Sequence, residues 1–367
     1  MKGQPEPING PPEDQLERLR QAIDEVDADL VRLLDQRARL ARQVGDLKAE
    51  KQLEVYAPAR ESQVFKRVFG LSSGDFPRPG LEAVFREIIS SARGLEAGLR
   101  VAYLGSEASL AHLAVRGVFG NSVLLESQTS SAEVLQKLAL AEADYGVLPV
   151  EVDEDGVVVH LLDRLWTSTL KVCRCAELAL AQHLISLAPA LNQVTRVFAS
   201  GLSLREGSSW LSSHLHQAAL VEVDSAAEGA RRAALDSSAA AIGPAALAED
   251  LSLRILASNV EGEGTRARFY VIGQSGAART GHDRCLFGFR LADQTGSLRD
   301  ALNVFAEAGV DLRSIEARSP AGGAVVVFGE MSGHPDDAAV ADALTGLGRY
   351  STDIRILGAY PEFPPGG

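Results

Sequence analysis

The feature that most constrains this chain is a long amphipathic stretch near its start. Its apolar residues recur at alternating spacings of three and four, at Leu16, Leu19, Ile23, Val26, Leu30, Leu33, Leu40, Val44 and Leu47. This spacing places their side chains along one face of an α-helix. One chain cannot bury so long a stripe by itself, so we expect two copies to pack together.

Arg37 is unusual because it falls in phase with the apolar residues of this stretch. At about 100° per residue, Lys48 returns to within about 20° of the direction of Arg37, whereas Arg20 lies about 100° away. Cations on the packed face of a helix are costly unless an anion neutralises them, so the pattern favours an anionic ligand. The alternative is that both side chains snorkel, with their aliphatic stems covering the core.

Length and charge limit the class of protein. The 367 residues suggest about two or three domains. A formal net charge of −13 argues against nonspecific binding to nucleic acid. No apolar run approaches the roughly 20 residues of a membrane span, and the polar, acidic start is unlike a signal peptide. We therefore expect a cytoplasmic protein with neither membrane nor nucleic-acid partners.

Cysteines and histidines give no sign of a metal site. Cys173, Cys175 and Cys285 show neither a disulfide framework nor the spacing of metal ligands, so we expect them to be small core residues. The seven histidines are scattered and form no HExxH-like pair. We predict no metal and no cofactor.

The pattern along the chain changes twice. Helical periodicity runs to about Lys51 and resumes over 60–69 and 81–95, which predicts an all-helical unit. From Arg100, short β-rich runs alternate with helical stretches, which predicts an α/β region with parallel strands. From near His282 the order is strand, helix, strand, strand, helix, strand, which predicts an α+β ferredoxin-like module.

Domain boundaries follow from these changes. We predict a disordered tail over 1–14, the helical domain over 15–98, the α/β domain over 99–276 and the last domain over 282–367. The segment GQSGAARTG at 273–281 is expected to be a linker.

Several motifs occur in a specific order. They are LRxxIDEVD at 19–27, LLDQRxxL at 33–40, VGxLK at 44–48, RE at 60–61, FREIISSARGLE at 85–96, VAYLG at 101–105, DYGVLPVE at 144–151, ARFYVIG at 267–273, TGSLRDAL at 295–302, IEARSP at 315–320 and ILGAYPEF at 356–363. Together they resemble the bifunctional chorismate mutase/prephenate dehydratases of phenylalanine biosynthesis. The resemblance implies an all-α mutase domain, a bilobed α/β dehydratase domain and a C-terminal ferredoxin-like ACT domain.

The resemblance also implies a first reaction and its residues. Conversion of chorismate to prephenate is a pericyclic shift without a base, nucleophile or cofactor, so catalysis requires a cage that folds a dicarboxylate and stabilises charge at the breaking ether bond. By resemblance, Arg37 and Arg60 bind carboxylates and Lys48 donates to the ether oxygen. Glu61 takes the ring hydroxyl, and Arg20 enters from the partner subunit.

Three positions depart from the mutase pattern. Ala57 and Ala92 stand where aspartate and serine are common, and Glu96 stands where glutamine commonly assists Lys48. A carboxylate at this position can help at the ether oxygen only when it is protonated. We therefore expect mutase activity to fall as the pH rises through the titration of Glu96.

The dehydratase motifs lack their polar groups. The TRF motif of the family reads Ala267, Arg268, Phe269, and Thr265 replaces the lost hydroxyl only if two residues are inserted in the strand. Four further motifs of the family are ENS, NHT, SHPQ and YLGPEGTFS. They correspond here to residues 151–153, 159–161, 199–202 and 103–111, which lack most of the hydroxyl and amide groups of those motifs. His160 persists and is expected to be a core or cleft histidine. We predict a dehydratase fold with impaired activity; the alternative is a working but rearranged cleft.

The last domain resembles a phenylalanine sensor. Its two effector motifs read Gly296, Ser297, Leu298 and Glu316, Ala317, Arg318, Ser319, and a glycine at a helix entrance lets backbone groups approach a carboxylate. The alternative is that these residues only turn a helix into the next strand. Three functions remain open: a mutase with a silent dehydratase domain, which we favour, a fully bifunctional enzyme making phenylpyruvate, or a noncatalytic amino-acid sensor. We expect a homodimer or tetramer.

Overall fold

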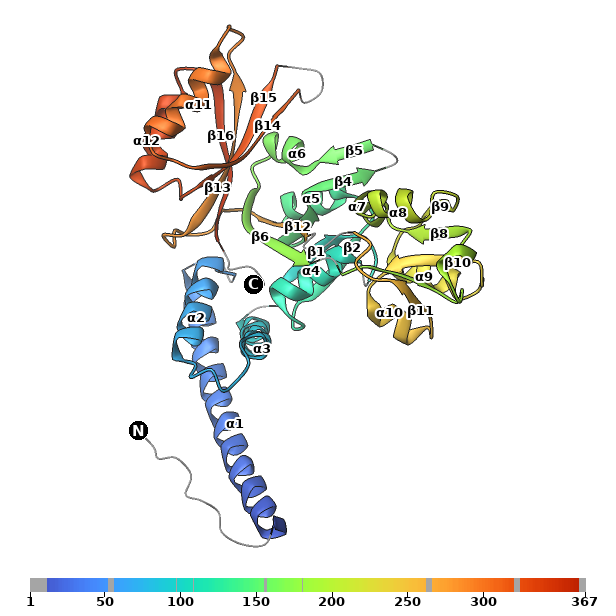
Figure 1. Cartoon of the computed structure of the whole chain (residues 1–367). Helices are drawn as coiled ribbons and strands as arrows, with labels where there is room; N and C mark the ends of the chain where they lie inside the picture. Colours follow the sequence, from blue (N-terminus) through green and yellow to red (C-terminus); the bar gives the residue numbers. More distant parts are fainter. Residues whose placement is uncertain are drawn as a thin grey trace.

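The computed structural model describes residues 12–51, 56–96, 98–107, 109–154, 157–179, 181–261, 266–319 and 324–362. The chain forms a helical unit, an α/β unit of two lobes and a C-terminal α+β unit, in that order (Figure 1). Residues 1–11 of the predicted tail lie outside the described residues. The first helix begins at Pro12, earlier than predicted, because proline is well suited to the first position of a helix.

The helical unit consists of α1 (Pro12–Glu50), α2 (Pro58–Leu71) and α3 (Arg78–Glu96). Helix α1 contacts α3 and extends away from the rest of the molecule (Figure 1). Its apolar stripe is uncovered in the single chain, since Ile23 and Val26 are each 59% exposed and Leu33 is 61% exposed. The predicted amphipathic helix is therefore present, with its apolar face unpartnered.

The first lobe is built around a parallel core of three strands. Its elements are β1 (Arg100–Leu104), α4 (Leu110–Phe119), β2 (Leu124–Gln128), α5 (Ser131–Ala139), β3 (Tyr145–Pro149), β4 (Glu151–Glu154), β5 (Val157–His160), α6 (Leu161–Trp166) and β6 (Lys171–Ala179). Strand β1 pairs in parallel with β2 and β3, as the sequence predicted.

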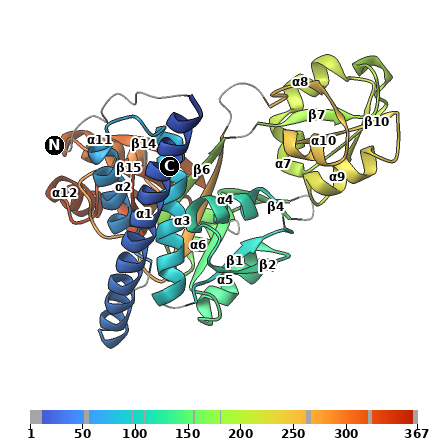
Figure 2. The ribbon, with the colours of Figure 1, turned by 90° about the horizontal axis from the view of Figure 1, so that it is seen from below.

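The second lobe is set apart from the first (Figure 2). Its elements are β7 (His183–Ser186), the 3-10 helix η1 (Leu191–Gln193), β8 (Arg196–Ala199), α7 (Gly201–Glu206), α8 (Ser208–His214), β9 (Ala219–Glu222), α9 (Ala226–Ala233), β10 (Ala239–Gly243), α10 (Ala245–Asp250) and β11 (Arg254–Ala257). They form a sheet of order β11-β7-β10-β8-β9.

The prediction of parallel strands was wrong for part of both lobes. Strand β12 (Arg266–Gly273) returns to the first lobe and runs antiparallel to β3 and β6, and β7 runs antiparallel to β10 and β11. The cause is topological. The chain passes from the first lobe to the second through β6 and β7 and returns through β11 and β12, so β12 runs against β6 and β11 runs against β7.

The C-terminal unit has the predicted order of strands and helices. Its elements are β13 (Asp283–Leu291), α11 (Ser297–Glu307), β14 (Leu312–Arg318), β15 (Val326–Ser332), α12 (Ala338–Leu347) and β16 (Ser351–Pro361). Its four strands continue into the first lobe, because β16 lies beside β6 in one nine-stranded sheet. Gly358 pairs with Val172 at this joint, where a Cβ atom would overlap the valine backbone.

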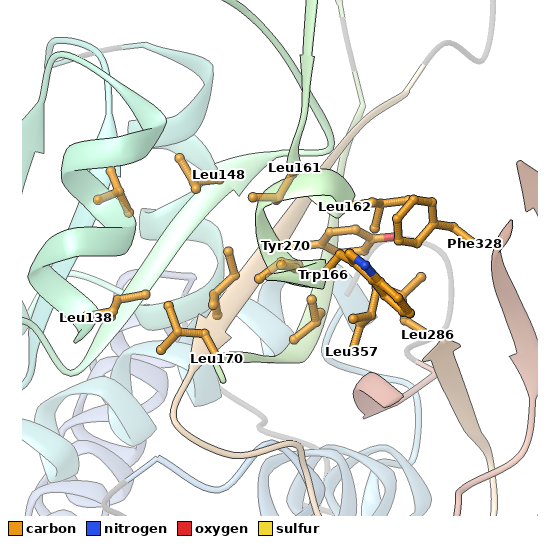
Figure 3. Packing of buried hydrophobic residues seen from close by; sticks show 14 of the residues in the cluster. Leu138, Leu148, Leu161, Leu162, Trp166, Leu170, Tyr270, Leu286, Phe328 and Leu357 are labelled. Atoms are coloured by element: carbon orange, nitrogen blue, oxygen red, sulfur yellow. The ribbon is translucent and has the colours of Figure 1, made fainter. Parts of the chain in front are cut away.

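The two units share a core as well as a sheet. One buried cluster contains Leu148 and Tyr270 of the first lobe together with Leu286 and Phe328 of the C-terminal unit (Figure 3). The expected linker over 273–281 is packed rather than loose, since the Ala277 N–H donates to the Ala359 carbonyl at 2.8 Å. The first lobe and the C-terminal unit therefore form one continuous body.

The three cysteines are free thiols in or near these cores. Cys173 and Cys285 are buried and Cys175 is half-buried, which agrees with their predicted role as small packing residues.

Candidate functional site

The predicted cations of α1 occupy different environments. Arg37 and Lys48 are half-buried, whereas Arg20 is exposed. A guanidinium nitrogen of Arg37 donates to the Ile88 carbonyl of α3 at 3.3 Å, so Arg37 lies where these two helices meet. The last turn of α1 carries Lys48 on the same side of the helix.

Arg20 is not brought to the other cations within one chain. It lies seventeen positions before Arg37 on a continuous helix, which is about 25 Å along the helix axis. Its ion pair is local, to Glu17 at 4.0 Å, and both side chains are 64% exposed. Any joint action of Arg20 and Arg37 requires a second copy of α1.

The first turn of α2 places its two predicted site residues in opposite environments. Arg60 is exposed and donates to the Gln63 side chain at 3.4 Å. Glu61 is 4% exposed, because the next residue of a helix is rotated by about 100°. Glu61 therefore faces the interior of the protein.

Glu61 is bound by two arginines, one from α3 of its own unit and one from β6 of the first lobe. One carboxylate oxygen accepts from Arg174 of β6 at 3.0 Å, and the other is paired with Arg93 of α3. The Arg174 side chain is 2% exposed and the Arg93 side chain is 7% exposed, so these charges are shielded from water. A carboxylate between two guanidinium groups is well compensated in such a place.

Tyr56 completes this group, which we call the junction cluster (Tyr56, Glu61, Arg93, Arg174). Its hydroxyl accepts from Arg174 at 3.3 Å, and the Arg93 guanidinium lies 4.7 Å from its ring centre. Burial raises the pKa of Tyr56, so the phenol stays protonated. The ring belongs to the buried apolar cluster of the first lobe, so the start of α2 is inserted into that lobe.

Sequence reasoning missed three members of the junction cluster. Arg93 lies within a quoted motif, but nothing there indicates a buried partner. Arg174 interrupts the apolar residues of β6, which is a visible signal, but its partner Glu61 is 113 positions away in the sequence.

The three positions of the helical unit that depart from the mutase pattern lie in different environments. Ala92 is buried on α3, one position before Arg93. Ala57 is exposed and gives α2 no side-chain cap, and its carbonyl accepts from the Glu61 N–H at 3.1 Å. The side chain of Glu96 lies outside the described residues.

In the first lobe, the position of the missing threonine is apolar. Ala267 is 8% exposed and belongs to the same buried cluster as Tyr103 and Phe269. Strand β12 pairs with β6 without interruption from Arg266 to Val271, so this paired segment holds no inserted residues. The alternative hydroxyl, Thr265, lies outside the described residues, as do the side chains of 151–160, His160 included.

The serine hydroxyls that follow β1 and β8 cap the helices that begin there. The Ser109 hydroxyl caps α4 by accepting from the His112 N–H at 3.2 Å, and the Ser200 hydroxyl caps α7 by accepting from the Ser203 N–H at 3.3 Å. In open α/β sheets, ligands bind at such strand ends. Both hydroxyls already satisfy helix termini there.

The effector candidates of the C-terminal unit lie on two elements. Gly296 has a φ of +91° and precedes α11, where Ser297 is buried and Leu298 is 39% exposed. Glu316 and Arg318 lie on the edge strand β14 and pair with each other at 2.7 Å. Arg318 also pairs with Asp163 of α6 at 3.1 Å, so one candidate effector-binding residue contacts the first lobe.

The described residues contain neither a membrane-spanning helix nor a metal-binding group of side chains. Within them, no helix has the length and apolar character needed to cross a membrane. The same residues include no group of three or more His, Cys, Asp or Glu side chains placed to hold a metal ion.

Comparison with known proteins gives two family matches and several long relatives. The family described as chorismate mutase type II matches residues 19–97, and the family described as prephenate dehydratase matches residues 101–277. A bifunctional chorismate mutase/prephenate dehydratase of Aquifex aeolicus is 33% identical over 95% of this chain and 98% of its own length. Its counterpart in Pseudomonas aeruginosa is 32% identical over 95% and 98%.

A solved structure also resembles this chain. It is a prephenate dehydratase of Arthrobacter aurescens in complex with L-Phe, with 27% sequence identity and a TM-score of 0.59. The match covers 72% of this chain and 90% of that one.

Proposed function

The chain belongs to the family of bifunctional chorismate mutase/prephenate dehydratases, and on that premise we propose that its helical unit converts chorismate to prephenate. The observation that carries this proposal is the pair of half-buried cations, Arg37 and Lys48, at the α1–α3 contact. Chorismate has two carboxylates and an ether oxygen that gains negative charge as its bond breaks. Positioned cations hold such a substrate in its reactive conformation and stabilise that charge.

The active assembly is proposed to be a homodimer or a tetramer built from dimers. The exposed stripe of α1 needs a partner of matching apolar character, and a second α1 supplies one. If the two helices run antiparallel, Arg20 of one copy approaches Arg37 of the other. This arrangement supports the role assigned to Arg20, which a single chain cannot provide.

The dehydratase unit is proposed to keep its fold with weak or lost activity. Loss of water and carbon dioxide from prephenate calls for polar groups at the leaving hydroxyl, and among the described residues position 267 is an alanine within a buried apolar cluster. A second candidate, the fully bifunctional enzyme, is favoured by the two activities for which the long relatives are named. The two differ in one product, phenylpyruvate.

We propose that the C-terminal unit is an ACT domain that responds to phenylalanine. The L-Phe complex of the Arthrobacter aurescens relative supports this effector. In this chain, the left-handed Gly296 opens the N-terminus of α11, where backbone N–H groups favour a carboxylate. Arg318 is already paired with two carboxylates, so an effector competes with Asp163 and Glu316 for it.

Turnover of chorismate by purified full-length protein tests the mutase proposal. We expect the native chain to consume chorismate and Lys48→Met to lose about a hundredfold to a thousandfold in kcat. Arg42→Met is the matched control, because Arg42 is an exposed cation on the same helix. Phenylalanine binding by a native chain without turnover would overturn the proposal in favour of a noncatalytic sensor.

A further inference from the structure

We propose that Arg174, a residue of the dehydratase unit, is a positioning residue for the mutase reaction and acts through Glu61. The inference rests on the proposed mutase function of the helical unit. It adds that the geometry of the mutase site depends on the neighbouring dehydratase unit. It concerns the junction cluster, which joins α2 and α3 to strand β6.

The contacts of Arg174 point to the start of α2. Its guanidinium donates both to the Glu61 carboxylate at 3.0 Å and to the Tyr56 hydroxyl at 3.3 Å. Tyr56 precedes α2 and Glu61 lies in its first turn, next to Arg60. One side chain of β6 therefore fixes the segment that carries two predicted mutase residues.

Arg174 has a rigid support. Strand β6 is an inner strand of the nine-stranded sheet, between β16 and β12. A side chain on such a strand can hold a neighbouring element within the narrow tolerance that catalytic geometry requires. Helix α2 also contacts β16, so its position is set from the sheet as well as from α3.

The chemistry of the cluster fits positioning by charge. Glu61 is a single carboxylate between two guanidinium groups, and each carboxylate oxygen has two lone pairs. If Arg174 is removed, Arg93 still pairs with one oxygen of the Glu61 carboxylate. The other oxygen loses its cationic partner, and the Tyr56 hydroxyl loses its donor. The first turn of α2 then loses its contact with β6.

A double-mutant cycle in the full-length protein tests this inference. The four proteins are the native chain, Arg174→Gln, Glu61→Gln and the double variant, and kcat and KM for chorismate are measured for each. We expect Arg174→Gln to lower kcat by about a hundredfold, the loss typical of a misplacement of about 1 Å. Because Arg174 acts through Glu61, the double variant should be no slower than Glu61→Gln.

Two further variants separate positioning from general damage. Arg174→Lys keeps a buried cation, so it should recover part of kcat and it remains informative if the glutamine variant folds poorly. Arg196→Gln removes another arginine of the dehydratase unit, one that pairs with Asp236 on the second lobe, and should turn over like the native chain.

The outcomes are distinct from those of the mutase proposal. Native kcat and KM in Arg174→Gln, beside an impaired Glu61→Gln, would overturn the positioning role and leave the mutase function standing. Losses that multiply in the double variant would also overturn it, because they mean that Arg174 acts independently of Glu61. Absence of turnover in the native chain would overturn both proposals.

Discussion

The helical unit and the first lobe of the dehydratase unit differ in the side chains at their expected functional positions. Arg37 and Lys48 remain as half-buried cations on a helix that also carries an apolar stripe. In the first lobe, the position of the expected threonine is Ala267, a methyl group inside an apolar cluster. A half-buried cation can bind an anionic substrate, whereas a buried methyl group stabilises the fold. We propose that Arg37 and Lys48 bind the substrate, whereas the side chain of Ala267 contributes to packing.

The largest effect that tests this comparison is expected at Arg37. Arg37→Ala should lower kcat/KM for chorismate by about a thousandfold, because it removes a cation that we propose binds a substrate carboxylate. The melting temperature should stay level or rise, since functional cations are retained at the expense of stability. Steady-state kinetics and calorimetry check the two halves, with exposed Arg39→Ala as control. A large loss of stability in Arg37→Ala would mean that Arg37 serves the fold.

Glu330 offers a contrasting charge that we assign to structure alone. It is 1% exposed and binds Arg268 of β12 at 2.8 Å and Arg284 of β13 at 3.0 Å. We expect Glu330→Gln to lower the free energy of unfolding by about 3 kcal/mol at neutral pH, because two cations lose their carboxylate. Chorismate turnover below the melting temperature should not change. A fall in kcat without loss of stability would contradict this assignment.

The same residue predicts a dependence of stability on pH. Burial alone would raise the pKa of Glu330, but Arg268 and its hydrogen bonds hold the pKa below the ordinary 4.5. Its stabilisation is therefore complete above that ordinary value and is lost as the pH falls through the lower value of the folded protein. Denaturant unfolding at several acidic pH values should show a smaller decline for Glu330→Gln than for the native chain. Parallel declines would contradict the assignment.

A smaller effect is expected at Ala267. Threonine and valine have the same shape, so Ala267→Thr and Ala267→Val differ only in a hydroxyl against a methyl group. In an apolar cluster the threonine variant should be less stable than the valine variant by about 1 kcal/mol, because its hydroxyl lacks a partner. Chemical denaturation measures the difference. If the threonine variant were the more stable one, polar groups able to serve a dehydratase would be present there.

The smallest effect is expected at Glu96. If a protonated Glu96 assists Lys48, mutase activity declines as the pH rises, and Glu96→Gln removes that decline because an amide donates at every pH. The comparison of kcat against pH for the two proteins is the measurement. Equal slopes would rule out the role of Glu96.

Much of the fold could be predicted because it follows local periodicity. The stripe from Leu16 to Leu47 specified α1, and the strand–helix order after His282 specified the C-terminal unit. The antiparallel return of β12 could not be predicted, because it depends on a chain crossing between two lobes. The joint of Gly358 with Val172 likewise depends on how two units meet.

For the candidate mutase site, the sequence predicted positions within a single helix but not contacts between elements. Helical phase places Arg37 and Lys48 on one side of α1, and the structure finds both half-buried there. Nothing local indicates that Glu61 would meet Arg174, since their contact depends on α2 being inserted into the core of the first lobe. The assigned roles of these residues remain predictions.

The most direct test of the account is the fate of chorismate. Purified full-length protein is incubated with chorismate, and prephenate and phenylpyruvate are separated without an acid quench, since acid converts the first into the second. The account predicts that prephenate accumulates with little or no phenylpyruvate. Phenylpyruvate formed as fast as chorismate disappears would contradict it and show that the dehydratase unit works without a hydroxyl at Ala267.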